Sequence, residues 1–569
     1  MEYLIFALAM LFFIVLIMIK GYWDSRQEQK KFIRKLHEQY GAAIDREYGP
    51  GELEQHISMY YKKHEEAHQI DDITWYDLHL DDVYRKINYS HSAAGDEYLY
   101  YRLRTPLQSR EELELEEKHI QYFMEHEKER VALQRQFARL GRMRKYSLYE
   151  YLEYLDTLGK RNSIRYYLAV VLVLIGISMM FYSVPVGLCA LLLILCRNMI
   201  FYFKEQKEIE PYITSFHYIS RLVESAELIG KEAIAEIASE REQLLSCCKA
   251  MEGFRRNSFI ILSGGRSGMG SVSSNPLEIL FDYVRMIFYL DLIKFNQMLH
   301  MVQKHLSEID RMATVIGKLE TAVVIGEYRT SLNGEYCVPE LLSGNGDDTF
   351  LKLEQLYHPL LNEPVKNDIE VEKGVLLTGS NASGKSTFLR AVALNAILAQ
   401  TIHTCMARSY RGGMFYIYSS MSLQDDLVSG DSYYMVEVKS IRRILKEVQE
   451  AGKDGNQVLC FVDEVLRGTN TVERIAASTQ ILKALADRNA ICFAATHDLE
   501  LTKLLDGIYD NYHFEEEIAD EDIFFPYRLQ KGPAVSRNAI ALLKVLGYDE
   551  TLVKDAEAMA EDFLNTGRW

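Results

Sequence analysis

The sequence predicts a mainly α-helical first part with membrane-spanning helices, followed by an α/β second part. Two long apolar runs within the first 200 residues predict the spans, and β-rich runs that alternate with helical segments after residue 351 predict the α/β part. The chain has 569 residues, of which 48% are hydrophobic and 25% charged. This composition excludes a disordered or fibrous protein, and the length predicts two to four folded units.

The charge balance does not favour nucleic acid as a partner of the chain as a whole. Lys and Arg number 64 and Asp and Glu number 81, so the net charge is −17. A chain of this charge repels phosphate backbones, and DNA contact would need a local basic patch. The eight cysteines form no Cys-x-x-Cys pair, which disfavours a zinc site or a disulfide framework and indicates a reducing compartment.

The first apolar run predicts a membrane anchor over residues 1–20. Tyr3 to Ile19 are 17 uncharged residues, the lower limit for a helix that spans a bilayer. A cleaved signal peptide carries positive charge before its apolar run, whereas here the Lys and Arg residues follow it, at positions 20, 26, 30, 31, 34 and 35. An uncleaved anchor is therefore favoured over a signal peptide and over a buried helix.

The second apolar run, Tyr166 to Cys196, predicts a transmembrane helical hairpin over residues 166–203. Its 31 residues exceed one ordinary span, and Pro185 and Gly187 near its middle favour a turn. Both flanks are basic, with Arg161 and Arg165 before the run and Arg197, Lys204 and Lys207 after it. The positive-inside rule then places both flanks in the cytoplasm, which two passes satisfy. A single tilted or kinked span is the alternative. The expected location is the cell membrane, as a multi-pass protein with its C-terminal half in the cytoplasm.

A phosphate-binding loop follows a short strand in the second part. Residues 374–378 are β-rich and apolar, residues 379–387 fit G-x-x-x-x-G-K-[ST], and an apolar helix runs from 388 to 398. In such a loop the backbone amides and the helix N-terminus approach the phosphates, Lys385 reaches the β and γ phosphates, and Ser386 ligates Mg²⁺. The nucleotide-binding residues predicted here are Gly379, Ser380, Asn381, Ala382, Ser383, Gly384, Lys385, Ser386 and Thr387.

Two further strands end in residues suited to nucleotide chemistry. The strand 458–462 ends in Asp463 and Glu464, which could bind the Mg²⁺ shell and orient or deprotonate an attacking water. The strand 490–495 ends in Thr496 and His497, whose imidazole could sense the γ-phosphate. A lone histidine is more often structural, but the strands of one nucleotide-binding sheet converge at its carboxyl edge. The sequence therefore predicts one site at that edge.

The second part resembles the ATPase domain of the MutS mismatch-repair family, which is related to ABC-type ATPases. The matching segments are 357–361, 367–369, 378–390, 399–400, 425–437, 463–471, 495–502 and 538–547. The resemblance implies an α/β P-loop ATPase domain of the ABC/MutS type over residues 351–569, with ATP and Mg²⁺ as cofactors. It also implies a helical dimerisation segment at 538–547.

In this family two nucleotides lie between two subunits, and a serine of the opposite subunit reaches the γ-phosphate. By similarity that serine is Ser432, although it could instead be only a helix cap. The catalytic residues implied are Lys385, Glu464, His497 and Ser432, with Ser386 and Asp463 as metal ligands, and the implied assembly is a homodimer through the ATPase domain.

The resemblance extends weakly to the helical part. Residues 87–99 and 103–107 resemble the start of the family's helical core, so 21–165 would begin this core and 204–350 would form its second half with the lever. The sequence also departs from the family, with Tyr433 where Thr is usual, Leu466 where Gly is usual, and Val365 where an aromatic often stacks on adenine. Residues 21–86 contain no Phe-x-Glu wedge, so specific mismatch reading is not expected.

The leading hypothesis is a membrane-anchored, MutS-like ATPase whose nucleotide-driven dimer closure moves a helical clamp. The clamp would act on a protein partner not yet identified, or on nucleic acid at the membrane, so DNA binding is possible. Membrane lipid would surround its spans. The alternative is a tethered mismatch-repair or recombination clamp that binds mismatched or branched DNA. An ABC-type transporter component and a non-hydrolysing scaffold are disfavoured. Local positive charge for DNA contact would come from Arg102, Arg104, Arg142, Arg144 and Lys145, although nearby glutamates could balance this cluster.

Overall fold

The computed structural model describes the chain except for a set of short segments. These are residues 1, 45, 144–145, 160, 257–282, 285, 343–348, 381–382, 422–432, 455, 468, 487–488, 520–521, 535–539, 541–542, 544–546 and 567–569. The chain divides into two compact units. Unit 1 consists of Met1–His64, Tyr89–Tyr100 and His119–Glu327, and unit 2 consists of Glu65–Asn88, Tyr101–Lys118 and Tyr328–Trp569. Unit 2 thus contains two segments that the sequence analysis assigned to the helical core.

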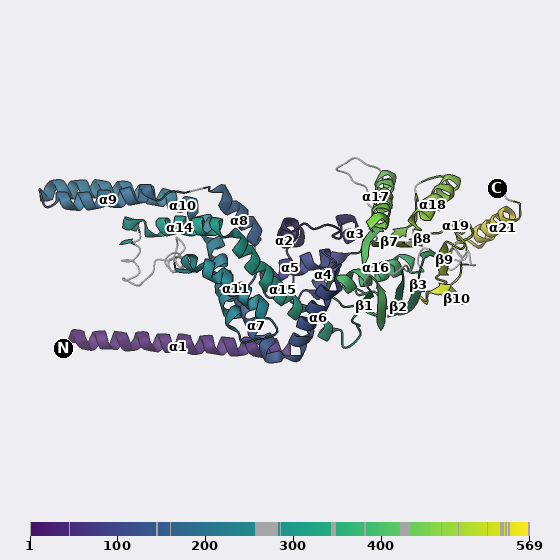
Figure 1. The fold of residues 1–569 in the computed structure, drawn as a ribbon, viewed down its shortest axis with the longest axis horizontal. Coiled ribbons are helices and arrows are strands. Elements are labelled where there is room, and N and C mark those ends of the chain that lie inside the picture. Colours follow the sequence, from purple (N-terminus) through teal and green to yellow (C-terminus); the bar gives the residue numbers. More distant parts are fainter. Residues whose placement is uncertain are drawn as a thin grey trace. The chain divides into compact units, whose positions relative to one another are not determined.

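Unit 1 is helical throughout its described residues (Figure 1). Its elements are α1 (Glu2–Glu38), the short π-helical turn η1 (Leu53–Ile57), α2 (Met59–Lys63), α7 (Glu127–Leu140), α8 (Leu148–Thr157), α9 (Ile164–Met179), α10 (Val184–Lys231), α11 (Ala238–Ala250) and α14 (Leu290–Lys304). Three further helices contribute residues to both units: α5 (Ala93–Arg104), α6 (Arg110–Glu125) and α15 (Leu306–Ser331).

The second apolar run folds into α9 and the first half of α10, which pack side by side. The Asn198 amide donates to the Ala169 carbonyl at 3.3 Å, and Gly176 lies against Leu191 and Ile194. The chain turns at residues 180–183, so the turn precedes the predicted centre and Pro185 lies in the first turn of α10. Proline is tolerated there because that backbone position needs no hydrogen-bond donor.

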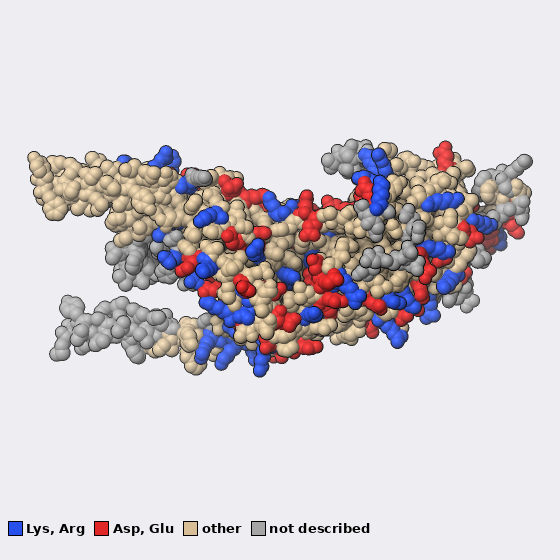
Figure 2. All heavy atoms as spheres, in the orientation of Figure 1, with Lys and Arg blue, Asp and Glu red and all other residues tan. Residues whose placement is uncertain are grey.

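The outer surface of α9 and of the first part of α10, up to Cys196, is apolar. In Figure 2 the end of this helical hairpin, around the turn between α9 and α10, shows no Lys, Arg, Asp or Glu on the visible face. The side chains of Phe181 and Tyr182 at this turn are 92% and 98% exposed. Among the described residues, α10 is the one helix whose length and composition would allow it to cross a membrane. The second helix of the run, α9, is apolar but has only 16 residues. The expectation of several membrane-spanning helices is therefore supported at α10 alone.

Unit 2 is an α/β domain built on a six-stranded sheet in the order β12-β9-β4-β8-β7-β6. All neighbours are parallel except β12, which pairs antiparallel with β9. The strands are β4 (Gly374–Thr378), β6 (Phe415–Ser420), β7 (Gln457–Asp463), β8 (Ala490–Ala495), β9 (Tyr509–His513) and β12 (Gln530–Lys531). Its helices are α3 (Asp72–Asp77), α4 (Leu80–Ile87), α16 (Lys385–Thr401), α17 (Tyr433–Asp454), α18 (Thr471–Leu485), α19 (Glu500–Leu504) and α21 (Glu550–Thr566).

Two smaller sheets complete unit 2. Four strands in the order β1-β5-β2-β3 are β1 (Glu340–Leu342), β2 (Leu351–Leu356), β3 (Asn367–Val371) and β5 (Ser409–Gly413). The strands β10 (Glu517–Ala519) and β11 (Asp522–Phe524) form an antiparallel pair.

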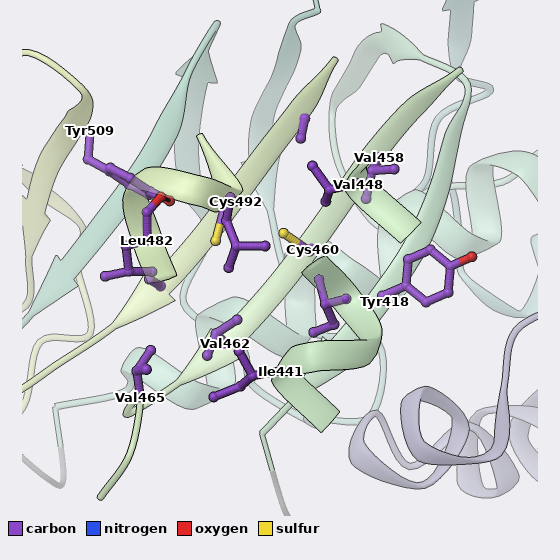
Figure 3. Close-up of a cluster of buried hydrophobic side chains, with 14 of the residues drawn as sticks. Tyr418, Ile441, Val448, Val458, Cys460, Val462, Val465, Leu482, Cys492 and Tyr509 are labelled. Carbon is purple, nitrogen blue, oxygen red and sulfur yellow. Dashed lines mark hydrogen bonds between the residues drawn. The ribbon is translucent and has the colours of Figure 1, made fainter. Parts of the chain in front are cut away.

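The central strands are buried on both faces, which explains their continuous apolar sequences. Figure 3 shows Val458, Cys460 and Val462 of β7 beside Cys492 of β8, packed against Ile441 of α17. Because this core covers the strands and fixes α17 against them, the residues that follow each strand have defined positions at the edge of the sheet.

Hydrogen bonds explain why residues 65–88 and 101–118 belong to unit 2. The Asp77 carboxylate accepts from Ser419 Oγ at 2.7 Å and from the Met421 amide at 2.8 Å, next to the end of β6. Arg443 of α17 pairs with Asp71 at 2.5 Å. These partners lie far apart in sequence, so no local pattern indicates them.

A buried ion cluster ties α6 to the α/β domain. Arg329 donates both terminal nitrogens to Glu117 at 2.7 Å, and His403 Nδ1 lies 2.9 Å from the same carboxylate. Burial by itself raises the pKa of Glu117, but the hydrogen bonds from Arg329 and His403 outweigh it and lower the pKa to about 2. The ionised carboxylate therefore contributes to the stability of unit 2.

We expect Glu117→Gln to lower the free energy of unfolding at pH 7 by about 3 kcal/mol, because it removes one partner of a buried ion pair. The folded-state pKa lies below the ordinary value of 4.5. The stabilisation is thus complete above pH 4.5 and is lost as the pH falls towards 2, so the difference between wild type and variant should narrow over that range. Urea unfolding of the detergent-solubilised chain at a series of pH values measures the free energy of unfolding of wild type and variant. Glu112→Gln, on the exposed face of the same helix, is the control, and equal stability of wild type and Glu117→Gln at pH 7 would contradict the expectation.

Candidate nucleotide site

The predicted phosphate-binding loop connects β4 to α16 in unit 2. Gly379, Ser380 and residues 383–387 are described, whereas Asn381 and Ala382 lie outside the described residues. Two of its glycines have left-handed φ angles, +138° at Gly379 and +101° at Gly384. A Cβ atom on Gly379 would lie 2.6 Å from the Phe514 carbonyl oxygen. The loop thus requires glycine at these positions for conformation and for space.

Lys385 is the first residue of α16, and its side chain folds back over the loop. Its Nζ donates to the carbonyls of Gly379 at 2.8 Å and Ser380 at 2.6 Å. The residue is only 4% exposed, and this burial lowers the pKa of the ammonium to about 8. The structure therefore holds the lysine at the loop whose backbone would surround the phosphates, where an anion would favour its charged form.

The two predicted metal ligands are in direct contact. Ser386 Oγ donates a hydrogen bond to Asp463 Oδ2 at the end of β7. Burial raises the pKa of the Asp463 carboxyl. No group of three or more His, Cys, Asp or Glu side chains among the described residues could hold a metal by itself. A hydroxyl and one carboxylate fit Mg²⁺, which takes few protein ligands and completes its shell with phosphate oxygens and water.

Glu464 and His497 form a second pair beside Asp463. His497 Nε2 lies 2.7 Å from Glu464 Oε1, and Arg467 Nε lies 2.9 Å from Glu464 Oε2. The hydrogen bond with His497 is the main cause that lowers the pKa of Glu464. The carboxylate is thus ionised near neutral pH, as a residue that orients or deprotonates water needs to be.

The described residues bring together every predicted site residue that they include. Ser432 lies outside them, because residues 422–432 are not described and α17 begins at Tyr433. Much of the predicted dimerisation segment, 538–547, also lies outside the described residues. The roles of these two segments stay predictions.

An aromatic side chain that the sequence analysis missed lies against the loop. The Tyr527 ring would come within 2.9 Å of a Cβ atom on Gly384, and its neighbour Phe525 stacks on it at 6.0 Å between ring centres. The Asn367 amide nitrogen donates to the Tyr527 carbonyl at 3.0 Å and lies 3.4 Å from the Val365 carbonyl. Tyr527 therefore lies beside the phosphate loop and next to Val365, and no sequence signal near residue 527 indicates this.

Several known proteins are similar in sequence to this part of the chain. A family profile described as MutS domain V matches residues 375–564. The chain is 33% identical over 214 residues to DNA mismatch repair protein MutS of Thermus thermophilus, which covers 37% of this chain and 26% of that protein. For the MutS of Clostridium kluyveri the identity is 29% over 287 residues, 48% of this chain and 32% of the relative. For that of Thermus aquaticus it is 34% over 209 residues, 36% of this chain and 25% of the relative.

Residues 375–564 of the chain match a domain of the MutS family, MutS domain V. The matched part of the chain spans only about a quarter to a third of the length of these relatives. The similarity to MutS proteins therefore rests on the MutS domain V in unit 2, which contains the loop, Asp463, Glu464 and His497.

One departure from the family pattern lies at a position with a left-handed backbone conformation. Leu466, where glycine is usual in MutS proteins, has a φ angle of +59°, and Glu464 two residues earlier has +57°. Non-glycine residues rarely adopt this left-handed region. The turn after β7 in this MutS domain is thus strained at two positions next to the candidate site.

We expect Tyr527→Ala to raise the dissociation constant for ATP about tenfold, because an aromatic face that stacks on a base contributes about 1–3 kcal/mol. Tyr527→Phe keeps the face and should bind within about twofold of wild type. Isothermal titration of the solubilised chain with ATP and MgCl₂ measures the constants. Phe524→Ala, at an exposed side chain of the same segment, is the control. Unchanged affinity in Tyr527→Ala would show that this ring does not contact the nucleotide.

Proposed function

We propose that the chain is a membrane-anchored MutS-type ATPase that binds and hydrolyses ATP as a homodimer and thereby moves its helical region. The observation that carries this proposal is the group of polar side chains at one edge of the parallel sheet. Ser386 and Asp463 are in contact there, next to the pair of Glu464 and His497. The match of residues 375–564 to MutS domain V supports ATP use.

The residues at this edge have distinct roles in the proposed reaction. The loop amides and Lys385 hold the β and γ phosphates, and Ser386 with Asp463 would hold Mg²⁺. Mg²⁺ at this place would neutralise charge that develops on the phosphates. Glu464 would orient the attacking water and accept its proton, and His497 would hold the Glu464 carboxylate through their contact of 2.7 Å. Ser432 of the opposite subunit would complete the site through the positive N-terminal end of α17.

Closure of such a dimer would bias the helical region between two arrangements. ATP shifts the equilibrium only by its difference in affinity for the open and closed forms. The helices α5, α6 and α15 contribute residues to both units, so they are the candidate transmitters. The partner that this movement serves is proposed to be a protein at the membrane.

We expect Lys385→Ala to abolish detectable ATP binding, and Glu464→Gln to bind ATP while its turnover falls by at least about a hundredfold. Because Glu464→Gln keeps ATP bound, it should also accumulate as a dimer in MgCl₂ and ATP. Phosphate release and light scattering of the solubilised chain measure turnover and mass. Equal hydrolysis by wild type and Glu464→Gln would remove this residue from the proposed role, and a monomer with a non-cleavable analogue would contradict the dimer.

Anchoring in the cell membrane is the second component of the proposal, with α1 and the helices α9 and α10 as its anchors. The exposed apolar surface of α9 and α10 would be stable in lipid and unfavourable in water. Exposed Arg165 and Arg197 at the base of this surface suit the cytoplasmic interface.

We expect the chain to stay in the membrane pellet after extraction at high pH, because apolar helices are held by burial in lipid rather than by charge. External protease on intact cells should leave both the segment before α9 and the MutS domain uncut, since a hairpin returns the chain to the cytoplasm. Cleavage of one of them would indicate a single span, and release into the soluble fraction would contradict anchoring.

DNA clamping, the alternative function, has the names of the relatives in its favour, since these are DNA mismatch repair proteins. Two arginines proposed for DNA contact are, however, engaged within unit 2. Arg102 and Arg104 are each 2% exposed; Arg102 pairs with Glu116, and Arg104 pairs with Asp72. In unit 1, Arg142 lies 3.3 Å from Asp96, and Arg144 and Lys145 lie outside the described residues. Hydrolysis that rises with branched or mismatched DNA would favour the clamp over the first proposal.

A further inference from the structure

A buried carboxylate on α17 contacts the strained turn after β7. Glu437 Oε1 accepts hydrogen bonds from the backbone amides of Leu466 at 2.5 Å and Arg467 at 3.4 Å. Glu437 is 4% exposed, and its other oxygen, Oε2, is buried without a hydrogen-bond partner among the described residues. A carboxylate in this environment costs solvation free energy, so its position calls for a reason beyond stability.

The packing of α17 directs Glu437 towards this turn. Ile441 follows four residues later, so both side chains lie on the same face of the helix. Figure 3 shows Ile441 directed into the apolar cluster formed with β7. The helix face that packs on the sheet therefore carries Glu437 at its N-terminal end, beyond the edge of the apolar core.

The turn held by Glu437 orients the predicted catalytic carboxylate. Arg467, whose amide Glu437 accepts, donates its side chain to Glu464 at 2.9 Å. Leu466, the other amide donor, has a φ angle of +59°, a left-handed conformation that is unfavourable for a non-glycine residue. The same turn is held from another side by Ser478 Oγ, which donates to the Val465 carbonyl at 3.1 Å. Without Glu437, one of the restraints on the conformation of residues 464–467 is lost.

We propose that Glu437 is a positioning residue for ATP hydrolysis, which holds the turn 464–467 in its left-handed form and thereby aims the Glu464 carboxylate. This inference rests on the proposed function, because it gives Glu464 the role stated there. Within the part of the chain that the structure describes, Glu437 makes no hydrogen bond to the phosphate loop. Its proposed effect is therefore on the chemical step and not on ATP binding. Since Glu437 lies in the first turns of α17, it also connects the start of that helix to the turn at the subunit's own Glu464.

The test compares steady-state hydrolysis by Glu437→Ala and Glu437→Gln in the full-length solubilised dimer. Glu437→Ala should lower kcat at least about tenfold while KM for ATP stays within about twofold, because a misplaced catalytic group slows chemistry without loosening the ligand. Glu437→Gln keeps an oxygen acceptor at the same place, so kcat should recover to within about threefold of wild type. Glu447→Ala is the matched control, since it removes one hydrogen bond, to Tyr418, from the same helix.

A second variant separates positioning from general damage to the fold. Adding Leu466→Gly to Glu437→Ala should restore part of kcat, because glycine adopts the left-handed conformation without the carboxylate. Hydrogen exchange at the amides of Leu466 and Arg467 should be faster in Glu437→Ala than in wild type, and it does not depend on hydrolysis. If the wild type fails to hydrolyse ATP, the proposed function fails while exchange still reports whether Glu437 holds the turn.

Three results would overturn the inference. The first is a kcat of Glu437→Ala equal to that of wild type or of Glu447→Ala. The second is a loss of ATP affinity in proportion to kcat, which would indicate a structural role. The third is unchanged amide exchange at residues 466 and 467.

Discussion

The candidate site depends on the parallel register of three neighbouring strands. Leu377 of β4 pairs with Ala495 of β8, and Ala495 pairs with Asp463 of β7. The Thr496 amide donates to the Leu377 carbonyl, and the Glu464 amide donates to the Ala495 carbonyl, both at 2.9 Å. Since parallel strands end at one edge, the residues that follow them meet in space although more than a hundred positions separate the loop from His497. Every proposed role at the site follows from this register.

Several energetically unfavourable features, namely buried ionisable groups and strained backbone conformations, lie close together around that edge of the sheet. Lys385, Asp463 and Glu437 are all largely buried. Burial lowers the pKa of the lysine and raises the pKa of the two carboxyl groups, so it favours the neutral form of each. Glu464 and Leu466 adopt left-handed backbone conformations next to them. Strain and buried charge of this kind persist only where surrounding structure holds them, and they are typical of functional sites. The apolar core of β7, β8 and α17 supplies this support, because it fixes the strand ends and the helix that carries Glu437.

Unit 2 buries charged side chains, whereas unit 1 leaves large apolar side chains exposed. In unit 2 the charged segments 65–88 and 101–118 become part of the α/β domain through buried pairs such as Arg329 with Glu117. In unit 1 the apolar helices α9 and α10 leave large side chains exposed, including Leu193 and Ile200 at 73% each. A polar group is stable inside the protein when it is paired, whereas exposed apolar surface of this extent needs lipid or a partner.

Short-range patterns in the amino-acid sequence specify the local features of this protein. The predicted strands 374–378 and 490–495 coincide with β4 and β8, and the loop motif, Asp463, Glu464 and His497 follow the strands as expected. The resemblance to MutS proteins can also be recognised from the sequence, because each of its motifs is a contiguous segment. These features depend on periodicity and on residues close in sequence.

Which distant residues meet depends on the three-dimensional fold. It placed Tyr527 on Gly384, engaged Arg102 and Arg104 inside unit 2, and brought Glu437 to the turn at Leu466. It also moved the turn between α9 and α10 to residues 180–183, ahead of the proline and glycine that suggested it. The physical reason is the same in each case. Contacts between residues far apart in sequence depend on shape and burial across the whole fold, which local residue patterns do not indicate.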